Sequence, residues 1–274
     1  MKPIPHAPRV LVFDSGVGSL SIGAEIHRLL PDLDLLYAMD RGGFPYGQWQ
    51  EQPLAEHICR KILDVLIDHP CDMLVVACNS ASTAVLPSLR SQVAIPVVGV
   101  VPAIKPAAQQ SSSGVIGLLA TPGTISRPYT AQLIADFASH CHVITAGDPG
   151  LASAVETFFW RGENSPAAWR QAIMHLAEKP RFAEMDTVVL ACTHFPLVQQ
   201  QLAKELTLFG KEVSWIDSGQ AIARRVAQLL NESGTTRELK QTGSQEALLL
   251  GEPEDSDSLA AVLKNRGIRL LSGR

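Results

Sequence analysis

Two cysteines with matching surroundings are the residues of this sequence best placed for chemistry. Cys78 follows the apolar run MLVVA and Cys192 follows the apolar run TVVLA. Such runs are typical of strands buried on both faces, and ligands bind at the carboxyl ends of the strands in open parallel α/β sheets. A single cysteine at such a point is usually a small packed side chain. Because the pattern occurs twice, we expect two related halves whose cysteines face one another across a cleft.

Two thiols on opposite faces of one carbon atom supply a base and an acid together. A thiol pKa of about 8.5 falls beside histidine, positive charge or a helix N-terminus. The thiolate then removes a proton from one face while the thiol delivers another proton to the other face, which inverts a stereocentre without a covalent intermediate. The carbanion spreads its charge into an adjacent carboxylate and needs fixed donors. Asn79, Ser80 and Thr193 are the expected donors, and His194 is placed to tune Cys192 or relay protons.

An acidic residue is expected at the same sheet edge as Cys78. The apolar run at 9–13 ends at Asp14, and the sequence DSGVGSLSI continues into a helix that starts near Ser19. The glycine spacing does not complete the dinucleotide fingerprint G-x-G-x-x-G. Asp14 is therefore either a helix cap or a group that assists Cys78.

Further polar side chains stand at predicted turns. Tyr46 lies between Pro45 and Gly47 in a loop, and Thr121 and Thr124 follow the buried strand GVIGLLA. Threonine hydroxyls at such a turn can cap the next helix and also face a ligand.

The sequence predicts no metal site. His140 and His142 have the spacing that puts both on one face of a strand, but no other cluster of metal ligands joins them. Glu156 lies in the helical pattern LASAVETFFW, where a single carboxylate is usually solvated.

The order of apolar runs and turns predicts two α/β domains. The segment 100–114 is rich in proline and then serine, so we expect a domain crossing near it. The strand and helix expected after residue 244 return to the first domain, with polar loops at 233–244 and 252–258. The predicted domains are 1–99 together with 211–274, which carries Cys78, and 100–210, which carries Cys192.

Composition sets the class of protein. The 274 residues are 46% hydrophobic and 18% charged, with a net charge of −4 and five cysteines without a CxxC pair. The charge supplies no basic field, so a nucleic-acid role is unsupported. No apolar run approaches the roughly 20 residues that span a bilayer, and no secretory signal is recognised at the N-terminus. An odd number of cysteines favours reduced thiols, hence a soluble cytoplasmic protein.

Several motifs in one order resemble a known family. The motifs DSGVGSLSI, FPYG, ACNSAST, VVPAIKPA, ATPGT, ACTHFPLV and IDSGQAIARR are similar to those of glutamate racemase, in the cofactor-independent aspartate/glutamate racemase superfamily. The resemblance runs from about Val10 to Leu230. It implies two pseudo-symmetric, doubly wound α/β domains with mainly parallel sheets and the active site in the cleft between them. It also implies no pyridoxal phosphate, no metal, supply of D-glutamate for peptidoglycan and, usually, a homodimer.

The resemblance also assigns roles by motif. Cys78 matches the cysteine that acts on D-glutamate and Cys192 the cysteine that acts on L-glutamate, while Asp14 and His194 match the assisting groups and Glu156 is a third candidate. The implied substrate-binding positions are Asp14, Ser15, Tyr46, Gly47, Asn79, Ser80, Thr121, Thr124, Thr193 and His194. Ser19, Ser80, Ala191 and Phe195 depart from the usual family residues, and none of these departures removes a catalytic group. Activation by a peptidoglycan precursor stays open.

Three other readings stay open beside this one. The first is a sister racemase acting on aspartate or a hydantoin. The second is a thiol hydrolase with Cys192 as nucleophile and His194 as base, which leaves Cys78 without a role. The third is a catalytically silent protein that binds an acidic metabolite.

Overall fold

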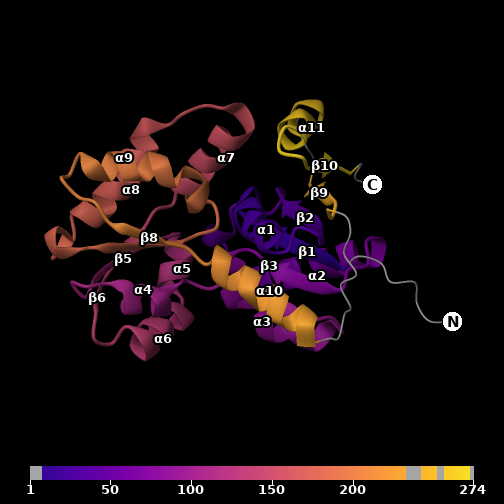
Figure 1. The fold of residues 1–274 in the computed structure, drawn as a ribbon, viewed down its shortest axis with the longest axis horizontal. Helices are drawn as coiled ribbons and strands as arrows, with labels where there is room; N and C mark the ends of the chain where they lie inside the picture. Colours follow the sequence, from indigo (N-terminus) through magenta and orange to yellow (C-terminus); the bar gives the residue numbers. More distant parts are fainter. Residues whose placement is uncertain (1–7, 233–241, 252–255, 272–274) are drawn as a thin grey trace. The chain divides into compact units, whose positions relative to one another are not determined.

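The computed structural model describes residues 8–232, 242–251 and 256–271, which pack into two compact units (Figure 1). Unit 1 contains the described residues of Met1–Phe44, Glu51–Val100 and Gly219–Arg274. Unit 2 contains Pro45–Gln50 and Val101–Ser218. Each unit is built on a parallel sheet, so the predicted α/β fold class is confirmed.

Unit 1 has a six-stranded sheet in the order β10-β9-β2-β1-β3-β4. All of its pairings are parallel. Its strands are β1 (Arg9–Asp14), β2 (Asp34–Asp40), β3 (Met73–Val76), β4 (Val97–Gly99), β9 (Gln245–Leu250) and β10 (Arg269–Leu270). The central strands β1 and β3 are almost entirely buried, as their continuous valine-rich and leucine-rich runs predict.

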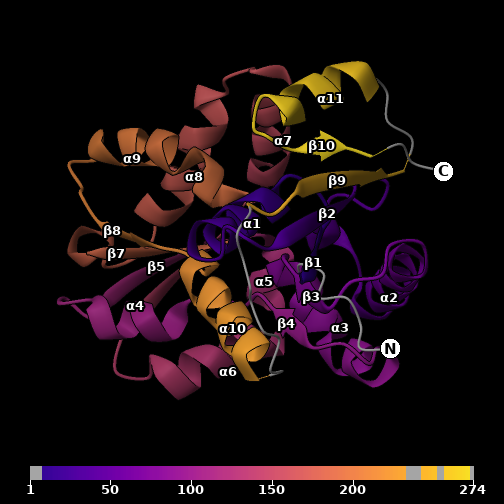
Figure 2. The same ribbon diagram turned by 45° about the vertical axis from the view of Figure 1, so that its right-hand side comes forward.

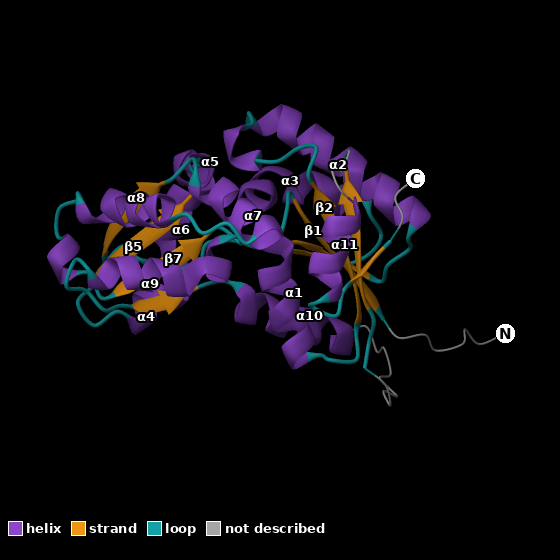
Figure 3. Ribbon diagram, turned by 90° about the horizontal axis from the view of Figure 1, so that it is seen from above, coloured by secondary structure: helices purple, strands orange, loops and turns teal. Residues whose placement is uncertain are grey.

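Helices cover both faces of this sheet. They are α1 (Gly18–Leu29), α2 (Glu51–Asp68), α3 (Asn79–Gln92), α10 (Gly219–Glu232) and α11 (Ser256–Lys264). Helix α1 packs against α10, and α2 packs against α3. Figure 3 shows these two pairs on opposite faces of the strands. The arrangement explains why the central strands show no alternation of polar and apolar residues.

The C-terminal segment completes the sheet of unit 1. Strand β9 pairs with β2, and β10 extends the edge, which Figure 2 shows as yellow strands beside the indigo β2. The return of this segment to the first sheet was expected. Two details differ from the prediction: residues 256–258 begin α11 rather than lie in a loop, and the short strand β10 was not predicted. Of the loop predicted at 233–244, residues 233–241 lie outside the described residues.

Unit 2 repeats the winding of unit 1. Its sheet has the order β6-β5-β7-β8, which matches β2-β1-β3-β4 strand for strand. Its strands are β5 (Val115–Ala120), β6 (His142–Gly147), β7 (Thr187–Ala191) and β8 (Ser214–Ile216). In this correspondence β7, which precedes Cys192, takes the place of β3, which precedes Cys78. The doubled cysteine pattern therefore reflects a doubled topology.

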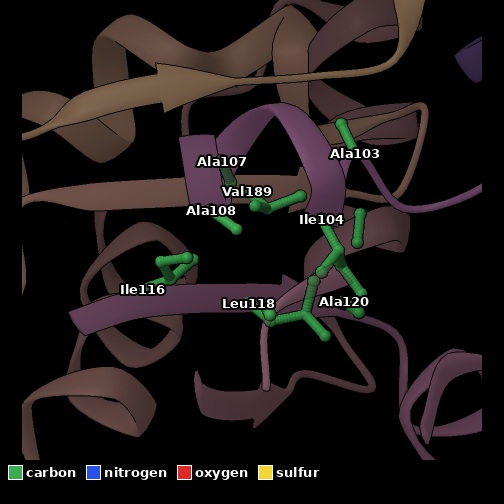
Figure 4. Packing of buried hydrophobic residues seen from close by; sticks show 10 residues of the cluster. Ala103, Ile104, Ala107, Ala108, Ile116, Leu118, Ala120 and Val189 are labelled. Carbon is green, nitrogen blue, oxygen red and sulfur yellow. The ribbon is translucent and has the colours of Figure 1, made fainter. Parts of the chain in front are cut away.

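Helices and short turns surround the second sheet. They are α4 (Ile104–Gln110), α5 (Pro122–Ser126), α6 (Pro128–Phe137), α7 (Leu151–Arg161), α8 (Pro166–Ala177), α9 (Gln199–Thr207), and the 3₁₀ turns η1 (Tyr46–Gln48), η2 (Phe182–Glu184) and η3 (Phe195–Val198). Figure 4 shows how α4 seats on the sheet: Ile104, Ala107 and Ala108 face Leu118 on β5 and Val189 on β7. Small alanines let the helix lie close to the strands, which is why this proline-containing segment packs as part of the core.

The unit boundaries differ from the predicted domains by one residue at Val100, which belongs to unit 1, and in two longer segments. Strand β8 pairs with β7, so the segment 211–218 lies in unit 2 and not with the C-terminal part of the chain. The loop Pro45–Gln50 also belongs to unit 2, although its flanking elements β2 and α2 belong to unit 1. Both differences arise from contacts distant in sequence, which local patterns do not encode.

The histidine pair near residue 141 does not share a strand face. Strand β6 begins at His142, so His140 and Cys141 precede it. Within the described ranges no group of three or more histidine, cysteine, aspartate or glutamate side chains is arranged to hold a metal ion. None of the described helices is long and apolar enough to cross a bilayer.

Candidate active site

In unit 1, Asp14 and Cys78 lie at the same edge of the sheet. Strands β1 and β3 are paired in parallel with Phe13 opposite Val76, and the Ala77 N–H donates to the Phe13 carbonyl at 2.7 Å. Asp14 is the last residue of β1, and Cys78 comes two residues after β3 ends. The predicted neighbourhood at the carboxyl ends of these strands is therefore present.

Cys78 stands at the N-cap of α3. Its backbone is extended, and its carbonyl accepts the first helical bond from the Ser82 N–H at 2.8 Å. Asn79 and Ser80 form the first turn and are each 3% exposed. The Oδ1 atom of Asn79 is buried and accepts no hydrogen bond from the described residues. A buried acceptor beside a helix N-terminus is suited to a ligand that carries its own N–H donor.

Ser82 fixes this turn, and the sequence did not indicate it. Its hydroxyl donates to the Val76 carbonyl at 3.0 Å and accepts from the Val100 N–H at 2.9 Å. The side chain thus joins the end of β3 to the residue after β4. The signal that could have identified Ser82 is its place on the buried face of the first turn of the predicted helix.

Asp14 is organised by the next residue. Its carboxylate is fully buried, and its Oδ1 accepts from the Ser15 N–H at 2.6 Å and from the Ser15 hydroxyl at 3.2 Å. These two bonds fix the orientation of the buried carboxylate.

In unit 2, Cys192 begins a chain of hydrogen-bonding groups. Its Sγ lies 3.8 Å from Nδ1 of His194, and Nε2 of the same ring lies 2.7 Å from Oε1 of Glu156. Cys192 follows β7 directly, and His194 precedes η3. Thr193 between them is 3% exposed. The structure thus joins His194 and Cys192 as expected. Glu156, which the helical pattern alone suggests is solvated and the motifs make a third candidate for an assisting group, has a side chain only 14% exposed and contacts the histidine.

The surroundings of His194 favour its charged form. Burial alone lowers the pKa of His194, but the hydrogen bonds to Cys192 and Glu156, and the charges of these groups, outweigh it and raise the pKa well above its ordinary value. An imidazolium beside a sulfur stabilises the thiolate. His194 is therefore held as a charged group between Cys192 and Glu156.

Tyr46 and Gly47 lie in unit 2 beside the two predicted threonines. A Cβ at Gly47 would stand 2.8 Å from Cβ of Thr121, so only glycine fits this contact. The Thr121 hydroxyl oxygen lies 3.1 Å from that of Thr124 and accepts the Thr124 N–H at 3.3 Å, as an N-cap of α5. Tyr46 is 1% exposed and meets the ring of Trp49 edge to face. The structure brings these predicted residues together.

The predicted site residues thus form two groups. Asp14, Ser15, Cys78, Asn79 and Ser80 lie in unit 1, and Tyr46, Gly47, Thr121, Thr124, Cys192, Thr193 and His194 lie in unit 2. The two cysteines are similarly buried, at 7% and 8% exposure. Each cysteine follows the same strand of the same winding and has its own polar neighbours. Each group therefore combines a thiol with hydroxyl, amide or imidazole side chains at the carboxyl end of a parallel sheet.

Comparison with known proteins gives a consistent family. Residues 26–226 match the model of the Asp/Glu/Hydantoin racemase family. Glutamate racemases of Shewanella sp. (strain MR-7) and Vibrio campbellii are 42% and 44% identical to the chain. These alignments cover 96% of this chain and 95% of the Shewanella protein, and 94% and 93% for the Vibrio protein.

Solved structures agree with the sequence relatives. Escherichia coli glutamate racemase, in complex with L-glutamate and the activator UDP-MurNAc-Ala, matches with a TM-score of 0.87 at 41% identity, over 97% of both chains. A glutamate racemase isoform of Bacillus anthracis matches with a TM-score of 0.80 at 27% identity, over 99% of this chain and 98% of the other. The chain therefore belongs to the Asp/Glu/Hydantoin racemase family, and within that family to the glutamate racemases.

Proposed function

We propose that this protein interconverts L- and D-glutamate by proton transfer at Cα between two cysteines. The observation that carries the proposal is the repeated winding, which ends in Cys78 in one unit and Cys192 in the other, each with its own polar partners. Glutamate racemases more than 40% identical over nearly the whole chain support the choice of substrate.

Each cysteine has a distinct role in this mechanism. The family resemblance assigns Cys192 to L-glutamate, so the thiolate of Cys192 removes the Cα proton while the Cys78 thiol delivers a proton to the opposite face. The reverse reaction exchanges these roles. The Cα–H bond breaks on one face, a new Cα–H bond forms on the other, and each sulfur changes its protonation state once. His194 stabilises the thiolate form of Cys192 and Asp14 assists on the side of Cys78.

The remaining side chains bind substrate. Asn79, Ser80 and Thr193 supply donors or acceptors beside the two cysteines, and the first turn of α3 supplies backbone N–H groups for a carboxylate. We also assign Ser15, Tyr46, Gly47, Thr121 and Thr124 to the substrate site on the family motifs. Fixed donors are needed because the carbanion places additional negative charge on the substrate carboxylate.

The biological setting is part of the same proposal. The Escherichia coli relative was solved with L-glutamate and UDP-MurNAc-Ala. We propose that this protein supplies D-glutamate for peptidoglycan, in the cytoplasm and as a homodimer, and that a precursor of this kind activates it. Turnover with and without UDP-MurNAc-Ala, and sedimentation analysis of the protein, test the last two points separately.

The first experiment is racemisation in deuterated water. The protein is incubated with L- and then D-glutamate, without added cofactor and with a metal chelator, while optical activity and the Cα proton are followed by polarimetry and NMR. We expect racemisation with solvent deuterium entering Cα. Exchange with aspartate alone assigns a sister racemase, and silence with both substrates, with UDP-MurNAc-Ala also present, refutes the proposed activity.

A thiol hydrolase is the second candidate that the geometry favours. Cys192, His194 and Glu156 follow one another in the order of nucleophile, base and orienting acid. This reading gives Cys78 no role. Loss of activity in Cys78→Ser as well as Cys192→Ser separates the racemase from the hydrolase.

A further inference from the structure

The carboxylate of Glu156 is held on both of its oxygens. Oε1 lies 2.7 Å from Nε2 of His194, and Oε2 accepts the indole N–H of Trp160 at 2.7 Å. Glu156 and Trp160 are one helical turn apart on α7, so their side chains lie on the same face. Trp160 is 8% exposed, so the hydrogen bond from its indole N–H to Glu156 is shielded from water.

An indole N–H is a donor and never an acceptor. It therefore bonds to the carboxylate without competing for the imidazole proton. A buried carboxylate with one fixed oxygen has its other oxygen aimed in one direction, here at the ring of His194. Hydrogen bonds to ionised groups are about twice as strong as neutral ones, so this contact is well suited to fix the rotamer of Glu156.

The helices α7 and α9, which pack against η3, carry further ionisable groups. Helix α7 carries Arg161, and α9 carries Lys204 and Glu205. Arg161 and Lys204 are exposed, and Glu205 forms an ion pair with Arg170. The charges that raise the pKa of His194 are those of Cys192 and Glu156.

We propose that Trp160 is a positioning residue: its indole holds Glu156 against His194 and thereby fixes the ring of His194 beside Cys192. Its catalytic consequence rests on the proposed racemase function, but the link itself is a property of unit 2. Without the indole N–H, the carboxylate loses one of the hydrogen bonds that orient it towards the ring, and its contact with Nε2 of His194 weakens. The imidazole is then held less firmly beside the sulfur of Cys192.

The test uses the reactivity of the two thiols. Trp160→Phe keeps a ring but removes the N–H, and alkylation by iodoacetamide is followed residue by residue with mass spectrometry at pH 7 and pH 10. We expect alkylation of Cys192 at pH 7 to slow by about tenfold, the scale of one hydrogen bond to a charged group, and the rates at pH 10 to converge. Cys78, equally buried but in unit 1, serves as the internal control and keeps its rate.

Trp169→Phe is the matched control variant. Trp169 is 2% exposed, lies on α8 in the same unit, and donates its indole N–H to Asn164 Oδ1 at 2.8 Å. The Trp169→Phe variant removes the same kind of hydrogen bond, but the bond that it removes is made to Asn164 and not to Glu156 or His194. Equal slowing of Cys192 in both variants, or a rate in Trp160→Phe within twofold of wild type, overturns the proposal.

A second measurement does not depend on folding of Trp160→Phe. The four tryptophans give four indole N–H signals in NMR spectra of ¹⁵N-labelled protein. In Glu156→Gln, the Trp160 signal moves because a neutral amide is a weaker acceptor than a carboxylate. The Trp169 signal stays in place. An unmoved Trp160 signal contradicts the link.

Kinetics then separate this inference from the proposed function. The two enantiomers have equal free energy, so kcat/KM must fall by the same factor in both directions, and we expect about tenfold for Trp160→Phe. If wild-type protein does not racemise glutamate but the alkylation and NMR effects are present, the proposed function fails and the positioning role stands. If racemisation is present and both effects are absent, Trp160 has no such role.

Discussion

Asp186 offers a direct test of how the strand before Cys192 is anchored. The residue immediately precedes β7, and its Oδ1 accepts from the hydroxyls of Ser111 at 2.6 Å and Thr187 at 2.9 Å. Its Oδ2 accepts from the N–H groups of Ser112 and Ser113, each at 2.7 Å. Partial burial alone raises the pKa of Asp186, but these four bonds outweigh it and lower the pKa to about 2.

The Asp186→Asn substitution removes the negative charge of the side chain and keeps its shape. The amide oxygen can take the two backbone N–H groups, while the amide nitrogen donates to the hydroxyl oxygens of Ser111 and Thr187, which reverse their roles. A pKa lowered by nearly two units corresponds to at most about 2.5 kcal/mol of stability. Solvent screening at this partly exposed site reduces that to about 1–1.5 kcal/mol.

The effect has a defined pH window. Because the folded pKa lies below the unfolded value of about 3.9, the stabilisation is present above that value and is lost as the pH falls towards 2. The difference in free energy of unfolding between wild type and Asp186→Asn is expected to be about half as large at pH 3 as at pH 7.

Urea unfolding followed by tryptophan fluorescence measures this effect. All four tryptophans, at 49, 160, 169 and 215, lie in unit 2, so the signal reports the unit that contains Asp186. Asp136→Asn, which neutralises an exposed carboxylate on α6, is the control and should change stability by less than about 0.5 kcal/mol. A difference for Asp186→Asn that is absent at pH 7, or that is the same at pH 7 and pH 3, refutes the reasoning.

Three further outcomes are expected. Cys78→Ser and Cys192→Ser each reduce racemisation in both directions by about 10²–10⁴, the scale of general acid–base catalysis, with glutamate binding retained in calorimetry; near-normal turnover in either variant contradicts the two-thiol mechanism. Gly123→Ala places a Cβ 2.5 Å from the Gly47 carbonyl oxygen, so it should lower unit 2 stability by about 1–3 kcal/mol and raise KM; an unchanged melting curve and KM argue against the contact. Ser82→Ala should cost about 0.5–1.5 kcal/mol in urea unfolding followed by circular dichroism, because it removes the hydroxyl that bonds to the Val76 carbonyl and the Val100 N–H and leaves only the direct bond between these two groups; an unchanged midpoint contradicts this.

Local patterns predicted much of this fold and part of the site. Continuous apolar runs marked the buried strands, and the break after each run placed Cys78 and Cys192 correctly at strand ends. The register of β1 with β3 then brought Asp14 to the edge expected for it. These features depend on short stretches of sequence whose burial follows from composition.

Contacts between distant segments were not predictable in the same way. Nothing local indicates that η1 seats on α5 or that β8 joins the second sheet. The two-residue strand β10 is too short to show a period. The Glu156–Trp160 contact is different, because the spacing of four in a predicted helix was visible, but its meaning required His194 to be placed nearby.

The return of the C-terminal segment to β2 has a consequence for synthesis on the ribosome. Asp40 of β2 pairs in register with Leu250 of β9, so 210 residues separate the two partners along the chain. At about 5–20 residues per second, one edge of β2 waits roughly 10–40 s for its neighbour. The parts of unit 2 are all made within that interval. The nascent chain therefore carries an unpaired strand edge after the whole of unit 2 has been made, and such an edge is a template for pairing with another chain.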